Sequence, residues 1–256
     1  STDRASVLSV CATGKTVWSR CLSRYWSRRR EPLRAVGGAA DADAQGDPAV
    51  YPDLVSDSVA VGDHHVTGSP YYQNTPMLGR LLAEWGDADV GALYLLPLWQ
   101  PVLLAEQIAT LASIAEGRFI MQCGLGRGDD QFSAMGQSIR FRPSAFEESL
   151  KCLRQLWRGE TVSSQGRFHF GAATISPIPP EPIDVWIGAN ATVAIERAAS
   201  MGDAWLAEPS LTVEQAKSAF NTYRQARELL GLSMPDTIAI RRDIHVSERP
   251  NEADLV

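Results

Sequence analysis

Two adjacent histidines follow an aspartate at the end of an apolar, strand-like run. The residues are Asp63, His64 and His65, and they come directly after 58–62. A histidine titrates near neutral pH, which suits it to general acid–base chemistry. Because neighbouring side chains of a strand point to opposite faces, at most one ring can face a site at the strand end, unless the strand has already become a loop.

A glycine-rich turn over 124–130 forms a second candidate site. Its glycines let the backbone come close to a ligand, and Arg127 can hold a phosphate with two hydrogen bonds. The turn is not the dinucleotide fingerprint, because its sixth position is Asp129 rather than glycine. The alternative is an ordinary strand-to-helix turn in which Arg127 pairs with Asp129 or Asp130.

A third candidate is the segment 188–192, where a strand ends in small residues and a helix begins. The first N–H groups of a helix and its dipole favour an anion at this position. The alternative is a plain helix start that is capped by Asn190 or Thr192. Two anion-suited turns at neighbouring strand ends together favour a cofactor that carries a phosphate.

Strand and helix patterns alternate along the chain. We expect strands at 7–10, 58–62, 89–96, 118–123, 183–187, 204–207 and 238–246. We expect helices from 17 and at 75–85, 101–116, 143–158, 192–200 and 212–230, and a hairpin over 162–175 around Gln165-Gly166. Thr75 is the expected N-cap of its helix, with Pro76 at the first position.

This alternation predicts βαβ units and a parallel sheet. A doubly wound open sheet and a (β/α)₈ barrel both fit the pattern. Polar residues recur at the strand ends and favour the barrel, whose loops meet at one mouth. The expected fold is therefore a TIM-type (β/α) barrel in a single domain over 1–256 that lacks its eighth β/α unit.

Composition excludes several classes of function. The 256 residues carry a net charge of −6, which argues against general affinity for nucleic acids. No apolar run approaches the ~20 residues of a membrane helix, and no signal-peptide core follows the start, so we expect a cytoplasmic protein. The four cysteines form no C-x-x-C pair, and His169 and His245 lack the spacing of helical zinc ligands, so no metal site is expected.

The motifs from Val59 to Val246 resemble those of the luciferase-like, flavin-dependent monooxygenases. The matching stretches are Gly62–His65, Tyr71–Pro76, Leu96–Gln107, Glu116–Phe119, Gly124–Asp130, Trp186–Gly188, Gly202–Leu206 and Arg241–Val246. They occur in the order and spacing of that family. The substrate is not specified by any of them.

The resemblance implies a TIM-type barrel, often dimeric, that binds reduced FMN supplied by a separate flavin reductase. With O₂ it oxygenates a small organic substrate. The resemblance places the active-site histidine at His64, with His65 beside it. The cofactor residues that it implies are Arg127 and Gly128, then Asn190, Ala191 and Thr192 for the phosphate, and Leu93 and Tyr94 along the flavin ring, often beside a non-proline cis peptide bond. Trp99, Tyr71 and Tyr72 are candidate walls of the pocket.

Two departures from the family leave the function open. The first fifty residues lack the usual acidic first helix, and the eighth unit, which contributes to the cofactor site in relatives, is missing. The main hypothesis is an FMN-dependent two-component monooxygenase, because the Arg127 position suits a simple phosphate. The alternatives are a deazaflavin-dependent oxidoreductase that transfers hydride on the same barrel, and a flavin-binding relative without catalysis.

Overall fold

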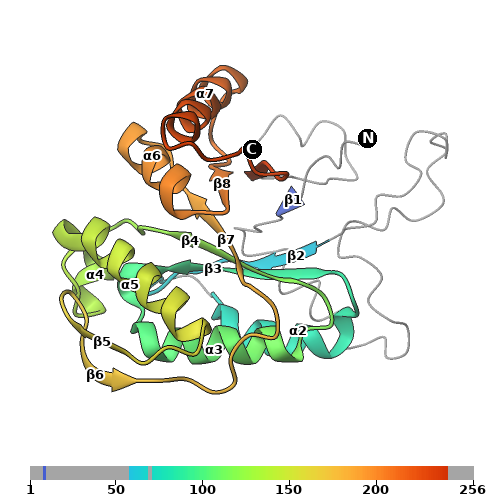
Figure 1. The fold of residues 1–256 in the computed structure, drawn as a ribbon, viewed down its shortest axis with the longest axis vertical. Coiled ribbons are helices and arrows are strands. Elements are labelled where there is room, and N and C mark those ends of the chain that lie inside the picture. The colour runs from blue at the N-terminus through green and yellow to red at the C-terminus, as the bar shows by residue number, and fades with distance from the viewer. Residues whose placement is uncertain (1–7, 10–57, 69–70, 242–256) are drawn as a thin grey trace.

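The computed structural model describes residues 8–9, 58–68 and 71–241 of the chain (Figure 1). Within these residues, seven parallel strands form one sheet in the order β1-β9-β8-β7-β4-β3-β2. The strands are β1 (Leu8–Ser9), β2 (Ser58–Val61), β3 (Asp89–Leu95), β4 (Phe119–Gly124), β7 (Asp184–Gly188), β8 (Ala204–Ala207) and β9 (Ala239–Arg241). Each lies at an expected position, whereas the helix expected from residue 17 and the end of the last expected strand lie outside the described residues.

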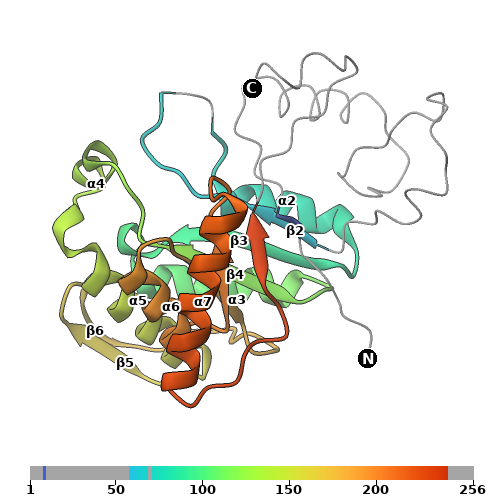
Figure 2. The same cartoon turned by 90° about the horizontal axis from the view of Figure 1, so that it is seen from above.

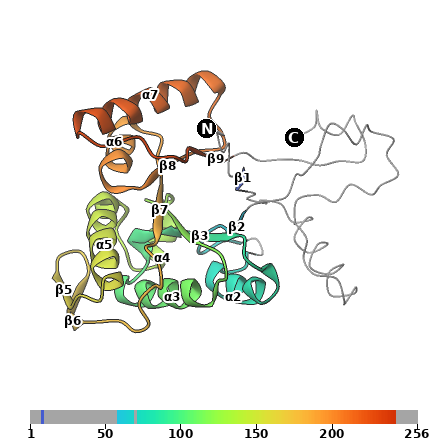
Figure 3. The ribbon, with the colours of Figure 1, turned by 45° about the vertical axis from the view of Figure 1, so that its right-hand side comes forward.

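The longer helices cover one face of a curled sheet (Figures 1 and 3). They are α2 (Asn74–Trp85), α3 (Pro101–Ile114), α5 (Arg142–Trp157), α6 (Thr192–Met201) and α7 (Val213–Leu229). A doubly wound sheet would carry helices on both faces. The fold is therefore of the TIM-barrel type, as expected, and in the described residues the edge strands β1 and β2 lie close together without pairing by hydrogen bonds.

Side chains alternate between the two faces of the sheet. Along β4, Phe119, Met121 and Cys123 join the large cluster beneath the helices, and Ile120 points to the concave side. The concave cluster consists of Ile120, Trp186, Ala204, Leu206 and Ala239. Strand β4 is thus buried on both faces, which is why it begins with the apolar run Phe119-Ile120-Met121.

The antiparallel hairpin forms where it was expected and stays separate from the main sheet. It consists of β5 (Val162–Gln165) and β6 (His169–Ala173), and it lies next to α5 (Figure 2). The carboxylate of Glu148 on α5 accepts hydrogen bonds from the Ser164 hydroxyl at 2.6 Å and from the N–H groups of Arg167 and Phe168 at 2.7 and 2.9 Å. This carboxylate therefore attaches the hairpin to the barrel wall.

Helix α2 begins one residue earlier than expected, so the predicted N-cap at Thr75 is wrong. The helix starts at Asn74, after the N-cap residue Gln73. The buried Asn74 side chain accepts a hydrogen bond from the Thr75 N–H at 2.7 Å and donates one to the Leu93 carbonyl at 2.7 Å. Asn74 thereby ties the start of α2 to β3.

Three short helices were not expected from the sequence. They are the 3₁₀ turns η1 (Leu96–Leu98) and η2 (Ile139–Phe141) and the helix α4 (Asp129–Ala134). All three follow the carboxyl ends of β3 and β4. No helix within the described residues is long and apolar enough to cross a membrane.

Candidate functional site

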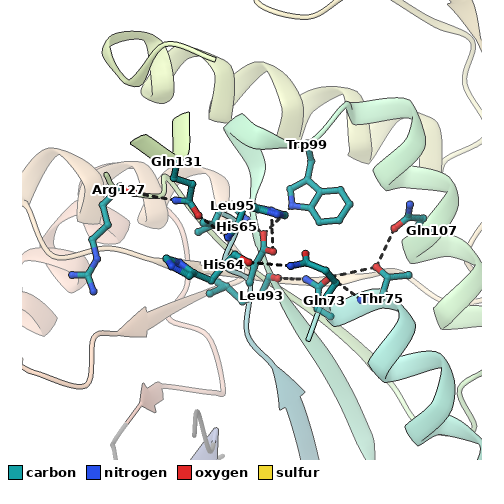
Figure 4. A network of polar contacts seen from close by, with 12 residues as sticks. His64, His65, Gln73, Thr75, Leu93, Leu95, Trp99, Gln107, Arg127 and Gln131 are labelled. Carbon is teal, nitrogen blue, oxygen red and sulfur yellow. Dashed lines mark hydrogen bonds and ion pairs between the residues drawn. The ribbon is translucent and has the colours of Figure 1, made fainter. Parts of the chain in front are cut away.

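The predicted site residues lie at one edge of the sheet. Strands β2, β3, β4 and β7 are neighbours and run parallel, so their carboxyl ends meet there. His64 follows β2, Arg127 follows β4 and Thr192 opens the helix after β7. In Figure 4 the His64 ring points toward the side on which the Arg127 side chain extends, and His65 points the other way, toward Trp99.

A buried carboxylate joins the ends of β2 and β3. The Asp63 side chain is fully buried, and its Oδ2 accepts hydrogen bonds from the Leu95 N–H and the Trp99 indole, both at 2.8 Å. The His65 Nε2 lies 3.2 Å from Asp63 Oδ1, close enough for an ion pair when the ring is protonated, although the two atoms are not aligned as a hydrogen bond. Asp63 is thus engaged with the protein and does not face a ligand.

The two adjacent histidines occupy different environments. His64 is exposed, and its ring meets that of Tyr71 edge-on at 5.7 Å. The His65 side chain is only 10% exposed, and its ring meets that of Trp99 edge-on at 5.5 Å. Strand β2 ends at Val61, so both histidines lie in the loop that follows it, and this loop, rather than the pleat of a strand, sends their rings to different sides. His64 is therefore the ring that a ligand at the strand ends can reach, whereas a catalytic role for His65 stays a prediction.

The turn after β4 presents Arg127 to solvent. Gly126 and Gly128 on either side have φ angles of 74° and 91°, in the region that favours glycine. In the described part of the chain, the Arg127 guanidinium forms no ion pair with Asp129, Asp130 or any other carboxylate. The alternative of an internally paired arginine therefore does not apply to these residues, and the guanidinium is available for an anion.

Helix α6 begins without a side-chain cap. Its N-cap is Ala191, no described side chain bonds to its first N–H groups, and Asn190 instead donates a hydrogen bond to the Glu208 carboxylate. Neither Asn190 nor Thr192 caps the helix, so the alternative of a capped helix start is wrong. The exposed N–H groups at Thr192 leave a helix end that suits an anion.

The Tyr94 side chain is completely buried in the cluster beneath the helices, where burial raises the pKa of its hydroxyl. This side chain therefore does not face the mouth, and a place for Tyr94 along a flavin ring stays a prediction. Leu93, one position earlier, points to the concave side and is partly exposed. Among the described residues the cis peptide bond is Ser176-Pro177, so the bonds of Leu93 to Leu95 are trans.

Other candidates fall outside this edge. Cys123 and Cys152 are buried, and burial raises the pKa of both thiols, which agrees with a packing role. The described residues contain no group of three His, Cys, Asp or Glu side chains that could hold a metal ion. A pocket of about 210 Å³ lies beside the hairpin turn and is lined by Pro97, Gln137, Ser138, Phe141, Ala145, Gly166 and Arg167. It includes none of the predicted site residues.

Two residues of this edge were missed by sequence reasoning. Gln131 is buried on α4, and its amide oxygen accepts a hydrogen bond from the His65 N–H at 2.8 Å. Its amide nitrogen donates to the Arg127 carbonyl at 3.0 Å. Arg142 donates to the Gly126 carbonyl at 3.1 Å. Neither residue belongs to a recognisable motif, so no signal in a single sequence marks them.

The chain is similar to known enzymes. Residues 56–255 match the family model described as luciferase-like monooxygenase. The chain is 25% identical over 161 residues to the F420-dependent glucose-6-phosphate dehydrogenase of Gordonia bronchialis, which covers 59% of this chain and 48% of that protein. It is 28% identical over 161 residues to the protein of the same name from Nakamurella multipartita, with 59% and 47% covered. The chain thus spans about half the length of the curated relatives it matches.

Solved structures share the fold. The monooxygenase RslO1 from Streptomyces bottropensis superposes with a TM-score of 0.68 at 24% identity and covers 77% of this chain and 63% of that one. An F420-dependent secondary alcohol dehydrogenase in complex with an F420-acetone adduct superposes with a TM-score of 0.63 at 19% identity, covering 72% and 59%. At these identities the likeness concerns the fold alone.

Proposed function

Because the chain belongs to the luciferase-like monooxygenase family, we propose that it is an oxidoreductase that transfers hydride between the deazaflavin F420 and a small alcohol or carbonyl substrate. One observation carries the choice of cofactor: the curated relatives are named F420-dependent glucose-6-phosphate dehydrogenases, at 25% and 28% identity. This reverses the order of the sequence-based hypotheses, which placed oxygenation with reduced FMN first.

The exposed residues of the site fit a cofactor that carries a phosphate. The Arg127 guanidinium has no carboxylate partner among the described residues, and the first turn of α6 has no side-chain cap. A guanidinium can bind a phosphate with two parallel hydrogen bonds, and a helix N-terminus adds backbone N–H groups. FMN and F420 both carry a phosphate, so this fit supports a flavin-type cofactor without separating the two.

The chemistry requires a proton acceptor beside the hydride acceptor. When bound, F420 takes up or gives a hydride. When an alcohol is oxidised, its C–H bond breaks, the hydride leaves with the bonding electron pair, and the hydroxyl proton passes to a base as the C=O bond forms. We assign this base to His64, whose exposed ring reaches the strand ends. General base catalysis contributes about 10²–10⁴-fold.

Asp63 does not serve as that base. Its Oδ2 holds the Leu95 N–H and the Trp99 indole, and its side chain is fully buried. Its role is to keep the end of β2 beside the end of β3, so that His64 stays at the mouth. Hydride transfer needs neither O₂ nor a reductase that delivers reduced FMN, and these two requirements separate the proposal from the monooxygenase hypothesis.

The test is an anaerobic titration of the purified chain with oxidised F420 and, separately, with reduced FMN. Secondary alcohols and glucose 6-phosphate are then added to the F420 complex, and loss of the visible absorbance of oxidised F420 is followed. We expect preferential F420 binding and turnover that persists without oxygen. Preferential binding of reduced FMN with oxygen-dependent product would overturn the proposal, and binding of neither would favour a relative without catalysis.

A matched pair of variants locates the proton step. His64→Gln removes the proposed base, and His169→Gln changes an exposed histidine of the hairpin in the same way. Only the first is expected to slow turnover. Equal rates for both variants and the wild type would remove His64 from the chemistry.

A further inference from the structure

One buried side chain connects the loop that carries His64 and His65, here called the histidine turn, to the glycine-rich turn 124–130 that carries Arg127, here called the arginine turn. Gln131 is 5% exposed, accepts the His65 N–H at 2.8 Å and donates to the Arg127 carbonyl at 3.0 Å (Figure 4). A glutamine amide has both an acceptor oxygen and a donor nitrogen, so it can satisfy an N–H on one side and a carbonyl on the other. These two partners also fix the orientation of the amide. In the flipped orientation its NH₂ group would face the His65 N–H, which is a donor, and its oxygen would face the Arg127 carbonyl, which is an acceptor.

The peptide that follows His64 is held on both sides. Its carbonyl, which belongs to His64, accepts a hydrogen bond from Gln73 Nε2 at 3.1 Å. Its N–H, which belongs to His65, donates to Gln131. A peptide unit with both polar groups engaged cannot rotate freely, so the direction in which His64 leaves the backbone is set by two glutamine side chains.

The backbone beside Arg127 is held in the same manner. The Gly126 carbonyl accepts from Arg142 at 3.1 Å, and the next carbonyl, that of Arg127, accepts from Gln131. Gly126 and Gly128 have positive φ angles of 74° and 91°, and glycine is the residue with the most backbone freedom to lose. Side-chain bonds to two successive carbonyls therefore select one conformation of a turn that its glycines would otherwise leave mobile.

We propose that Gln131 is a positioning residue that couples the placement of His64 to the placement of Arg127. The inference rests on the proposed function, which gives His64 the proton and Arg127 the phosphate. Gln131 touches neither group, and it acts through the backbone of both turns. Because coupling between two sites is reciprocal, occupation of Arg127 by a phosphate also stabilises the placement of His64.

Three variants test separately the two hydrogen bonds of Gln131, to the His65 N–H and to the Arg127 carbonyl. Gln131→Met removes both. Gln131→Glu, while ionised, keeps the acceptor for the His65 N–H but loses the donor to the Arg127 carbonyl. Gln107→Met is the matched control, because Gln107 is a partly buried glutamine that accepts one hydrogen bond, from the Thr75 hydroxyl at 3.0 Å, outside both turns. Melting curves establish that each variant is folded.

Two measurements are made on each variant at mildly alkaline pH. The first is amide hydrogen exchange of His65 in the cofactor-free chain, and the second is F420 affinity by titration. Losing one hydrogen bond is expected to change each value by about three- to tenfold. Gln131→Met is expected to speed His65 exchange and raise the Kd, Gln131→Glu to raise the Kd alone, and Gln107→Met to change neither.

A double variant distinguishes positioning from a general loss of structure. If Gln131 acts through Arg127, Gln131→Glu adds no further loss of F420 affinity to Arg127→Ala, whereas an unrelated structural effect would add to it. Additive losses, or wild-type His65 exchange in folded Gln131→Met, would overturn the proposal. If Gln131→Met does not fold, the proposal is tested by the F420 Kd of Gln131→Glu and by that of the double variant Gln131→Glu with Arg127→Ala. Should the wild type bind no F420, the proposed function fails, and His65 exchange in the cofactor-free chain still decides whether Gln131 holds the histidine turn.

Discussion

Replacing Asp63 is the perturbation whose cost to stability follows most directly from the structure. Its buried Oδ2 is the acceptor for the Leu95 N–H and the Trp99 indole N–H, both at 2.8 Å. Asp63→Ala leaves these two donors without an acceptor. A buried donor without a partner costs about 1–3 kcal/mol, so the free energy of unfolding should fall by about 2–6 kcal/mol.

The isosteric variant separates shape from charge. Asp63→Asn keeps an oxygen within reach of both donors but removes the negative charge, which makes each hydrogen bond weaker. We expect it to lose about 1–3 kcal/mol, the difference between charged and neutral hydrogen bonds taken over two bonds. The order wild type, Asp63→Asn, Asp63→Ala is therefore part of the prediction.

Urea denaturation and thermal melting measure this loss. For a chain of this size, 1 kcal/mol corresponds to about 2–4 °C in Tm, so Asp63→Ala should melt about 5–20 °C lower. Asp236→Ala changes an exposed aspartate and serves as the control, with an expected effect within about 0.5 kcal/mol. A loss below about 1 kcal/mol for Asp63→Ala would refute the argument that this carboxylate holds the ends of β2 and β3 together.

Three further outcomes test the cofactor site and the hairpin. Arg127→Ala should weaken F420 binding by about 1.5–3 kcal/mol through lost charged hydrogen bonds, and a titration that gives the wild-type Kd would exclude Arg127 from the site. His64→Gln should keep that affinity and slow hydride transfer by about 10²–10⁴-fold in single-turnover measurements, and an unchanged rate would contradict its role as base. Burial alone would raise the pKa of Glu148, but the hydrogen bonds from Ser164 and the 167–168 backbone, together with the Arg167 charge, lower it overall from its ordinary 4.5. The ionised Glu148 carboxylate therefore stabilises the fold at a pH above the pKa that it has in the unfolded chain, and this stabilisation is lost as the pH falls through its lower pKa in the folded chain. Urea denaturation should give a higher free energy of unfolding for the wild type than for Glu148→Gln at neutral pH, and equal values in acid. A difference that does not depend on pH would contradict a stabilising role of this carboxylate.

The fold was predictable where periodicity extends over enough residues. The alternation of strands with helices indicates a parallel sheet, and the structure has one, in which β4 is buried on both sides. Helix α4 was not predictable, because its six residues span less than two turns and show no period. The start of α2 was misplaced because Asn74, rather than Thr75, supplies the side-chain oxygen at the helix start, and both types are good candidates there.

In the candidate site, too, some features follow from the local sequence and others depend on contacts between distant segments. The pleat of β3 separates Leu93 on the concave face from Tyr94 in the core, whereas His64 and His65 lie past the end of β2, where the pleat does not apply. The family resemblance marked both Leu93 and Tyr94, because it identifies a segment of the chain and not a face of the strand. Gln131 is visible to neither rule, since its two partners belong to turns that only the folded sheet brings together. A site assembled from several strand ends therefore shows its exposed reactive groups in the sequence, and the side chains that hold those groups in register appear only in the structure.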